Sequence, residues 1–200
     1  MRTRLLLRIA MLALLLNLTG CPRQLVQPYD NRLLDDAETL YRETAAMIDR
    51  GIRVSPANDA ARAAIAAPET HAGHASQFRP DYASAISTVD VMLLRALASQ
   101  QSVSPVGERL QTRINSLLDE ALPSACAELQ ADMAALAGPR LTIANLVDLK
   151  CLLIRWQAQH EDPTLTRQTL ILKQSNWALR KSALFKAVLS IETAERAKSE

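Results

Sequence analysis

The chain has 200 residues, 48% of them hydrophobic and 22% charged, with a formal net charge of +2 at pH 7. This length favours a single domain, and this balance excludes a disordered or fibrous chain. Aromatic residues make up only 4% and there are five glycines, so alanine and leucine supply most of the apolar side chains. Because these two residues lose little entropy on entering a helix, the composition favours an all-α fold.

The first twenty residues have the features of a targeting segment. Arg2, Arg4 and Arg8 precede a short apolar run, residues 9–16. A run of this length cannot cross roughly 30 Å of hydrocarbon as a helix. A basic start, a short apolar middle and small residues near a cleavage point are typical of a secretory signal peptide.

The cleavage point carries a more specific motif. Leu18, Thr19, Gly20 and Cys21 resemble the lipobox of bacterial lipoproteins, in which small residues separate a leucine from a cysteine. The resemblance implies cleavage before Cys21, diacylglycerol on its sulfur and usually a third acyl chain, such as palmitate, on the new amine. Two or three chains make release negligible, since each buried CH₂ contributes roughly 0.8 kcal/mol. The alternative is an ordinary signal peptide followed by a chance cysteine.

These boundaries divide the chain into a signal peptide (1–20), a lipidated tether (21–29) and one helical domain (30–200). Removal of residues 1–20 deletes three arginines and no acid, which leaves 20 basic and 21 acidic residues, a net charge of −1. The mature chain therefore has no basic excess that would indicate a nucleic-acid partner.

Helical patterns begin directly after the tether. Asp30 is placed to cap a helix over residues 31–50, and Gly51 stands where a helix-ending C′ glycine is expected. Residues 58–67 are alanine-rich and predict a short helix. Residues 68–78 have the composition of a loop, and we expect residues 52–79 to be the most mobile part of the domain.

The middle of the chain repeats the pattern three times. Apolar residues at spacings of three and four predict a helix over residues 81–100. Ser104 and Pro105 begin another helix as N-cap and first turn. Pro123 opens the next, which ends at Gly138.

The last third contains two more predicted helices. Thr142 is placed to cap a helix to about His160 that is apolar nearly all round and therefore expected to be buried. Asp162 and Pro163 are expected to start the last and longest helix, and residues 195–200 to fray. Apolar residues recur every seven positions along it, at Leu170, Trp177, Leu184 and Ile191. The pattern predicts an antiparallel bundle of five to six helices.

Two cysteines remain beyond the anchor, Cys126 and Cys151. An exported protein meets an oxidising compartment, where cysteines pair. The two residues lie at similar distances on either side of Gly138, so an αα-hairpin turning there brings them to the same height. We expect a disulfide between them, although two buried free thiols remain the alternative.

The sequence offers little catalytic chemistry. His71 and His74 have metal-ligand spacing but no third ligand nearby, and we interpret them as solvated histidines. His160 is interpreted as a surface or capping residue at a helix end. Lys173, Arg180, Lys181 and Lys186 are interpreted as a solvated basic side of the last helix, and the tryptophans as core residues. We therefore expect no enzyme activity, no metal and no cofactor.

A second resemblance concerns the start of the domain. Pro28, Tyr29 and Asp30, soon after the lipobox and leading into a leucine-rich helix, look like a group of small helical bacterial lipoproteins of unassigned function. The sequence predicts a non-enzymatic, periplasm-facing scaffold or adaptor that binds an envelope protein. The alternative is a helical bundle that binds a small ligand or lipid. Because Pro22 is not the aspartate that retains many lipoproteins in the inner membrane, the outer membrane is favoured.

Overall fold

The computed structural model describes residues 29–98, 126 and 141–198 of the chain. This part contains no β-strand, and the all-α prediction is confirmed. Its elements are four long helices, one short helix and two 3₁₀ turns: α2 (Asn31–Val54), α3 (Asp59–Ala63), η1 (Pro68–Thr70), η2 (Ala75–Gln77), α4 (Arg79–Ala98), α7 (Leu141–Glu161) and α8 (Gln174–Arg196). The helices predicted from Ser104 and from Pro123 lie outside the described residues, apart from Cys126.

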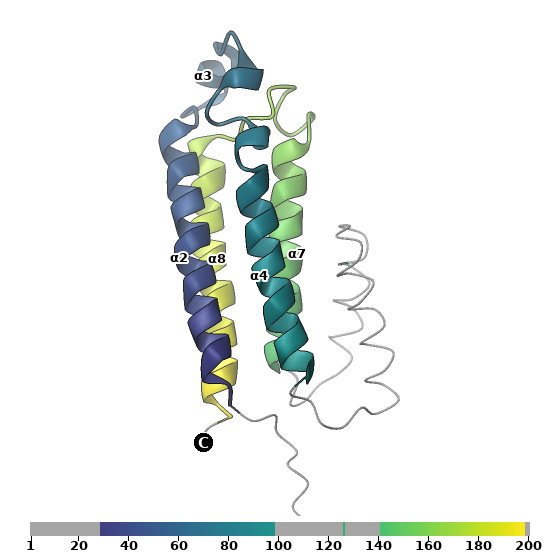
Figure 1. The fold of residues 1–200 in the computed structure, drawn as a ribbon. Coiled ribbons are helices and arrows are strands. Elements are labelled where there is room, and N and C mark those ends of the chain that lie inside the picture. Colours follow the sequence, from purple (N-terminus) through teal and green to yellow (C-terminus); the bar gives the residue numbers. More distant parts are fainter. Residues whose placement is uncertain (1–28, 99–125, 127–140, 199–200) are drawn as a thin grey trace, which may run out of the picture.

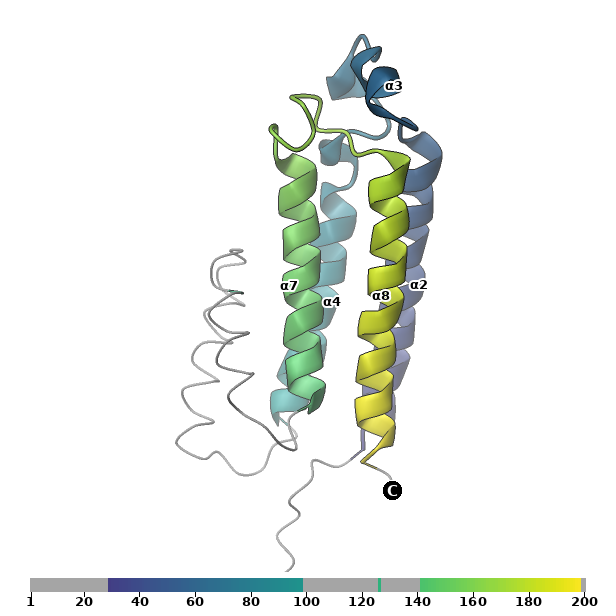
Figure 2. The ribbon, with the colours of Figure 1, turned by 180° about the vertical axis from the view of Figure 1, so that it is seen from behind.

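The four long helices pack side by side in a ring, in which α2 contacts α4 and α8, and α7 contacts the same two helices (Figure 1; Figure 2). Contacts at the helix ends establish their directions. Gln174 N–H, at the start of α8, donates to Pro56 O just beyond α2 at 3.1 Å. At the other end, Asp30 N–H donates to Glu195 Oε2 at 3.3 Å. Helices α2 and α8 therefore run in opposite directions.

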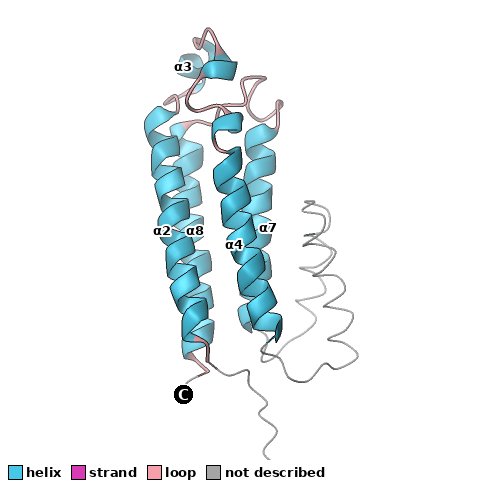
Figure 3. Ribbon diagram, viewed as in Figure 1, coloured by secondary structure: helices cyan, strands magenta, loops and turns pink. Residues whose placement is uncertain are grey.

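The two described connecting segments, between α2 and α4 and between α7 and α8, lie at one end of the bundle (Figure 3). We call this the loop end; it comprises residues 55–78 and residues 162–173. The opposite end holds Tyr29 and the last described residues of α8, and we call it the terminal end. The first described residue of the chain and the end of α8 therefore lie at the end of the bundle opposite the loop end.

The start of α2 is as predicted, but its end is not. Asp30 Oδ1 accepts from Arg32 N–H at 2.9 Å, which confirms the N-cap. The helix continues through Gly51 to Val54. Gly51 is buried because it faces Trp177: a Cβ atom at this position would lie 2.4 Å from two atoms of the indole ring. The glycine is needed for a close helix approach, and its prediction as a C′ cap was wrong.

The predictions for α7 and α8 also need correction. Thr142 is not an N-cap; it lies inside α7, is buried, and its hydroxyl donates to Glu195 Oε1 at 2.5 Å. Helix α8 begins at Gln174 and not at Asp162. It continues to Arg196, and Glu195 is fully buried, so the predicted fraying from residue 195 is wrong for the described residues up to 198.

The shorter elements follow local capping. Asn58 Oδ1 accepts from Ala61 N–H at 2.9 Å and starts α3 within the predicted alanine-rich segment. The expected loop over residues 68–78 contains η1 and η2. Helix α4 covers most of the predicted residues 81–100 and begins slightly earlier, at Arg79.

The core runs the length of the bundle and is centred on α7, as expected for a helix that is apolar nearly all round. Cys126 and Cys151 are both buried in it, with their Cα atoms 5.5 Å apart. This separation lies within the range that a disulfide spans, so the predicted juxtaposition of the two cysteines is confirmed.

Candidate functional site: the loop end of the bundle

The connection between α7 and α8 has a strained backbone. Arg167, Gln168 and Leu170 have positive φ angles of 51°, 65° and 50°. Non-glycine residues adopt this left-handed conformation at a cost of order 1–3 kcal/mol each, and they keep it only where the surroundings impose it. Here Gln168 N–H donates to Pro163 O at 2.7 Å. Such strain concentrates at functional sites, which makes this segment the first candidate.

Asp162 organises the turn that replaces the predicted helix start. Its Oδ1 accepts from Thr164 N–H at 2.7 Å and from Leu165 N–H at 3.2 Å. Further along, Leu170 O accepts from Ala75 N–H at 2.9 Å. The two connecting segments of the loop end are therefore hydrogen-bonded to each other.

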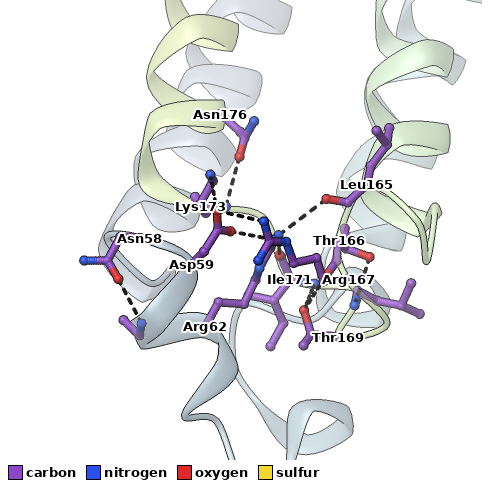
Figure 4. Close-up of polar contacts among 12 residues, drawn as sticks. Asn58, Asp59, Arg62, Leu165, Thr166, Arg167, Thr169, Ile171, Lys173 and Asn176 are labelled. Carbon is purple, nitrogen blue, oxygen red and sulfur yellow. Dashed lines mark hydrogen bonds and ion pairs between the residues drawn. The ribbon is translucent and has the colours of Figure 1, made fainter.

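A polar cluster around Arg62 and Asp59 joins the same segments (Figure 4). Arg62 is only 4% exposed; it donates to Asp59 Oδ1 at 2.6 Å and to Ile171 O at 3.3 Å. Asp59 Oδ2 lies 3.2 Å from Lys173 Nζ and 3.6 Å from Arg167 Nη2. The hydrogen bond from Lys173 is the main cause that lowers the pKa of Asp59. One carboxylate thus faces three cations, and the cluster has a positive surplus.

Beneath the loops lies a second cluster, built around Arg180. This residue is 4% exposed, and its guanidinium donates to Tyr82 Oη and, at 2.8 Å, to Trp156 O. Its Cζ atom lies 5.1 Å from the ring centre of Trp177 and 5.5 Å from that of Trp156. Such distances permit cation–π attraction. We call Arg180, Tyr82, Trp156, Trp177 and His160 the Arg180 cluster.

His160 extends the hydrogen bonding of this cluster to the loop. It is fully buried, and its Nε2 lies 3.2 Å from Gly73 O. A carbonyl oxygen only accepts, so Nε2 carries the proton and Nδ1 is the acceptor that faces Tyr82 Oη at 3.4 Å. Burial lowers the pKa of His160 to about 3 and raises that of Tyr82 to about 12. Both groups are therefore neutral near pH 7.

The charge of Arg180 is not balanced locally. No carboxylate among the described residues forms an ion pair with it, and burial lowers its pKa. A groove of about 420 Å³ between α7 and α8 is lined by Arg180 together with Trp156, Leu172, Leu179 and Asn176. The loop end thus combines a strained segment, a cluster in which three cations share one carboxylate, and a groove beside a buried cation.

The structure changes the interpretation of several predicted residues. His160 is a core residue, and Arg180 is not part of a solvated basic side. His71 and His74 are half-buried; His71 Nδ1 accepts from Gly73 N–H at 2.9 Å and His74 Nδ1 from Ser76 N–H at 3.3 Å. They shape the loop and are not simply solvated. Cys21 lies outside the described residues.

Other predicted side chains keep their interpretation or acquire a partner. Trp156 and Trp177 are core residues, as expected. Lys173 pairs with Asp59, Lys181 pairs with Asp49 at 2.7 Å, and Lys186 is exposed. Within the described part of the chain, no group of three or more histidine, cysteine or acidic residues is placed to hold a metal ion.

Sequence reasoning missed Arg62 as well as the buried state of Arg180. Arg180 follows Trp177 by three residues and precedes Leu184 by four, so its position on the buried face of α8 was detectable from helical spacing. Arg62 gave no comparable signal, because the carbonyl groups that accept from it belong to the distant residues 165 and 171.

Comparison of the chain with protein-family models, with curated proteins and with solved structures found no match. In residues 29–98, 126 and 141–198, every helix is too short or too polar to span a bilayer. The function must therefore be argued from the residues and their geometry.

Proposed function

We propose that this protein is a lipid-anchored lipoprotein of the bacterial cell envelope, whose helical domain faces the periplasm and acts as a non-enzymatic scaffold or adaptor. The lipobox ending at Cys21 supports the anchor. The proposal includes an outer-membrane location and, for residues 30–200, an antiparallel bundle of five to six helices. The segments starting at Ser104 and Pro123 would supply the remaining helices.

One geometric observation carries the adaptor function: Tyr29 and Asp30, the first described residues, lie at the terminal end, and both described loops lie at the other. Helix α2 has 24 residues, and a helix rises 1.5 Å per residue, so the two ends are roughly 36 Å apart. A lipid on Cys21 would tether the terminal end, which leaves the loop end free to meet a partner. Binding residues commonly occupy loops held by a rigid scaffold.

The composition of the loop end indicates what such a partner would carry. The side chain of Arg167 is 70% exposed, and Arg167, Arg62 and Lys173 share the single carboxylate of Asp59. Leu165, in the same segment, is 57% exposed. An exposed arginine beside an exposed leucine suits a partner surface with a carboxylate next to an apolar contact point.

Site-specific photocrosslinking in membranes tests this proposal. A photoreactive amino acid is placed at Leu165 or, as a matched control, at Leu141, which is 62% exposed near the terminal end. We expect a discrete protein adduct from position 165 only. Equal adducts from both positions, or none from either, would contradict the adaptor function.

The anchor is tested separately by the intact mass of the protein purified from membranes. We expect a chain that begins at Cys21 and carries acyl chains, and we expect both features to be lost in a Cys21→Ala variant. An unlipidated but exported chain would make the protein a soluble secreted bundle. An uncut chain would contradict export itself.

A specific observation favours a second function, the binding of a small ligand. The groove between α7 and α8 has a volume in the range of ligand pockets, and a buried charged residue lines it. Ligand binding is compatible with the adaptor function, since the groove and the exposed loops belong to the same end of the bundle.

A further inference from the structure

Arg180 is a buried cation for which the described part of the chain supplies no carboxylate partner. Its guanidinium makes two hydrogen bonds, and both acceptors, Tyr82 Oη and Trp156 O, are neutral. A guanidinium has five N–H donors, so most of them have no acceptor among the described residues. Aromatic rings offset part of the desolvation. Burial of a charge without a counter-charge is nevertheless strongly unfavourable, and an anion entering the adjacent groove would relieve it.

The lining of this groove restricts the chemistry of that anion. Trp156, Leu172 and Leu179 supply apolar surface, and none of the described residues that line the groove is acidic. Asn176 lies four residues before Arg180 on α8 and so shares its face. Its Oδ1 accepts from Lys173 N–H at 3.1 Å, which leaves the Nδ2 group to donate. The groove therefore offers cationic and amide donors beside an apolar wall.

We propose that the groove between α7 and α8 binds a medium-chain fatty acid, with the carboxylate at Arg180 and Asn176 and the alkyl chain along Trp156 and the leucines. A volume of about 420 Å³ suits roughly a dozen heavy atoms, at about 30 Å³ for each group of the size of a water molecule. A peptide would bring backbone N–H and C=O groups that an apolar wall leaves unpaired. The inference rests on the second proposed function, ligand binding, and requires neither the adaptor function nor the anchor.

Titration with octanoate tests this inference on the full chain, held in a nonionic detergent at pH 7. Binding is followed by calorimetry and by the fluorescence of Trp156 in the groove wall. Octanol has the same chain length without the charge and controls for partitioning into apolar surface and detergent. We expect octanoate to bind saturably and at least tenfold more tightly than octanol.

Substitutions in and near the groove test whether it is the site that binds octanoate more tightly than octanol. Arg180→Met, which keeps a long apolar stem, is expected to lower the octanoate affinity at least tenfold, to the level of octanol. The control Lys181→Met removes a neighbouring charge that is half-exposed and paired with Asp49, and it should change the affinity less than twofold. An unchanged octanoate affinity in a folded Arg180→Met protein would overturn the inference.

A second variant, Asn176→Asp, tests the inference independently in case the Arg180→Met protein does not fold. Aspartate has the same size and retains an oxygen to accept from Lys173 N–H, and it places a carboxylate beside Arg180. We expect the melting temperature to rise while the octanoate affinity falls at least tenfold. Equal binding of octanoate and octanol, or the absence of saturable octanoate binding, would overturn the inference. Stronger binding of a short peptide with a free leucine carboxyl terminus would assign the groove to peptides instead. None of these outcomes affects the photocrosslinking result.

Discussion

Replacement of Gly51 by alanine measures how closely α2 and α8 approach each other. The new methyl carbon would lie 2.4 Å from Trp177 Cδ2 and Cε2 and 2.8 Å from Cζ2. Carbon atoms pack favourably at about 3.5–4.0 Å, so the ring must move by roughly 1 Å. That ring is fully buried; its Nε1 donates to Ser55 Oγ at 2.9 Å and it lies 4.8 Å from the ring of Phe78.

The expected net cost follows from two opposing effects. Overpacking of a filled core costs typically about 1–3 kcal/mol, and more when the neighbour is held firmly. Alanine in place of glycine inside a helix contributes about 1 kcal/mol in the other direction. We expect Gly51→Ala to lower the free energy of unfolding by about 2 kcal/mol, measured by urea denaturation. The exposed helical control Ser87→Ala should stay within about 0.5 kcal/mol of the parent.

A double-mutant cycle identifies the cause of this cost. Trp177→Val removes every ring atom that the methyl group meets, so in that background Gly51→Ala should become neutral or stabilising. If Gly51→Ala stabilises the parent protein by about 1 kcal/mol, the close approach is wrong. If its cost is the same with valine at position 177, the destabilisation arises elsewhere.

Three further predictions concern other parts of the bundle. The pKa of His160 is about 3 in the folded state and 6.5 in the unfolded state, so between these pH values only the unfolded state binds the extra proton. The free energy of unfolding should therefore fall by about 2 kcal/mol from pH 7 to pH 5. In urea denaturation, His160→Gln should lack this part of the pH dependence. Glu195→Ala leaves Thr142 without its acceptor and should lower the free energy of unfolding by about 2–3 kcal/mol. The control Glu192→Ala loses only a 3.8 Å ion pair on the surface of α8 and should lower it by less than about 0.5 kcal/mol. Equal costs would refute the burial of Glu195. Thiol titration of the denatured, unreduced protein should find Cys126 and Cys151 blocked, and their reduction should lower stability by about 3 kcal/mol; two free thiols would disprove the disulfide.

Helix starts that depend on neighbouring residues could be predicted from the sequence. Asp30 and Asn58 cap helices through side-chain oxygens that reach backbone amides two or three residues ahead, and such contacts need no tertiary partner. The buried character of α7 could also be predicted, because the helix carries apolar residues nearly all round. Local chemistry alone fixed these features.

The loop before α8 and the role of Gly51 depend on distant partners and could not be predicted. Asp162 and Pro163 resemble a helix start, and Leu170 continues the seven-residue spacing of α8, yet both segments belong to a loop. The loop is set by Ala75, which donates to Leu170 O, and by Pro56, which accepts from Gln174 N–H. Gly51 was misinterpreted for the same reason, since its role depends on a tryptophan 126 positions away along the chain.

The two ends of the bundle each bury a charged side chain, but the partners of these two side chains differ. At the terminal end, the carboxylate of Glu195 accepts hydrogen bonds from the Thr142 hydroxyl and the Asp30 N–H group, and it forms an ion pair with Lys198. At the loop end, the acceptors that the described residues offer to Arg180 are both neutral. A bundle selected for stability alone would gain from an apolar residue at position 180, because buried charges seldom repay their desolvation. Ligand binding therefore explains the buried guanidinium of Arg180 more directly than a contribution to stability does. The octanoate titration distinguishes these two explanations.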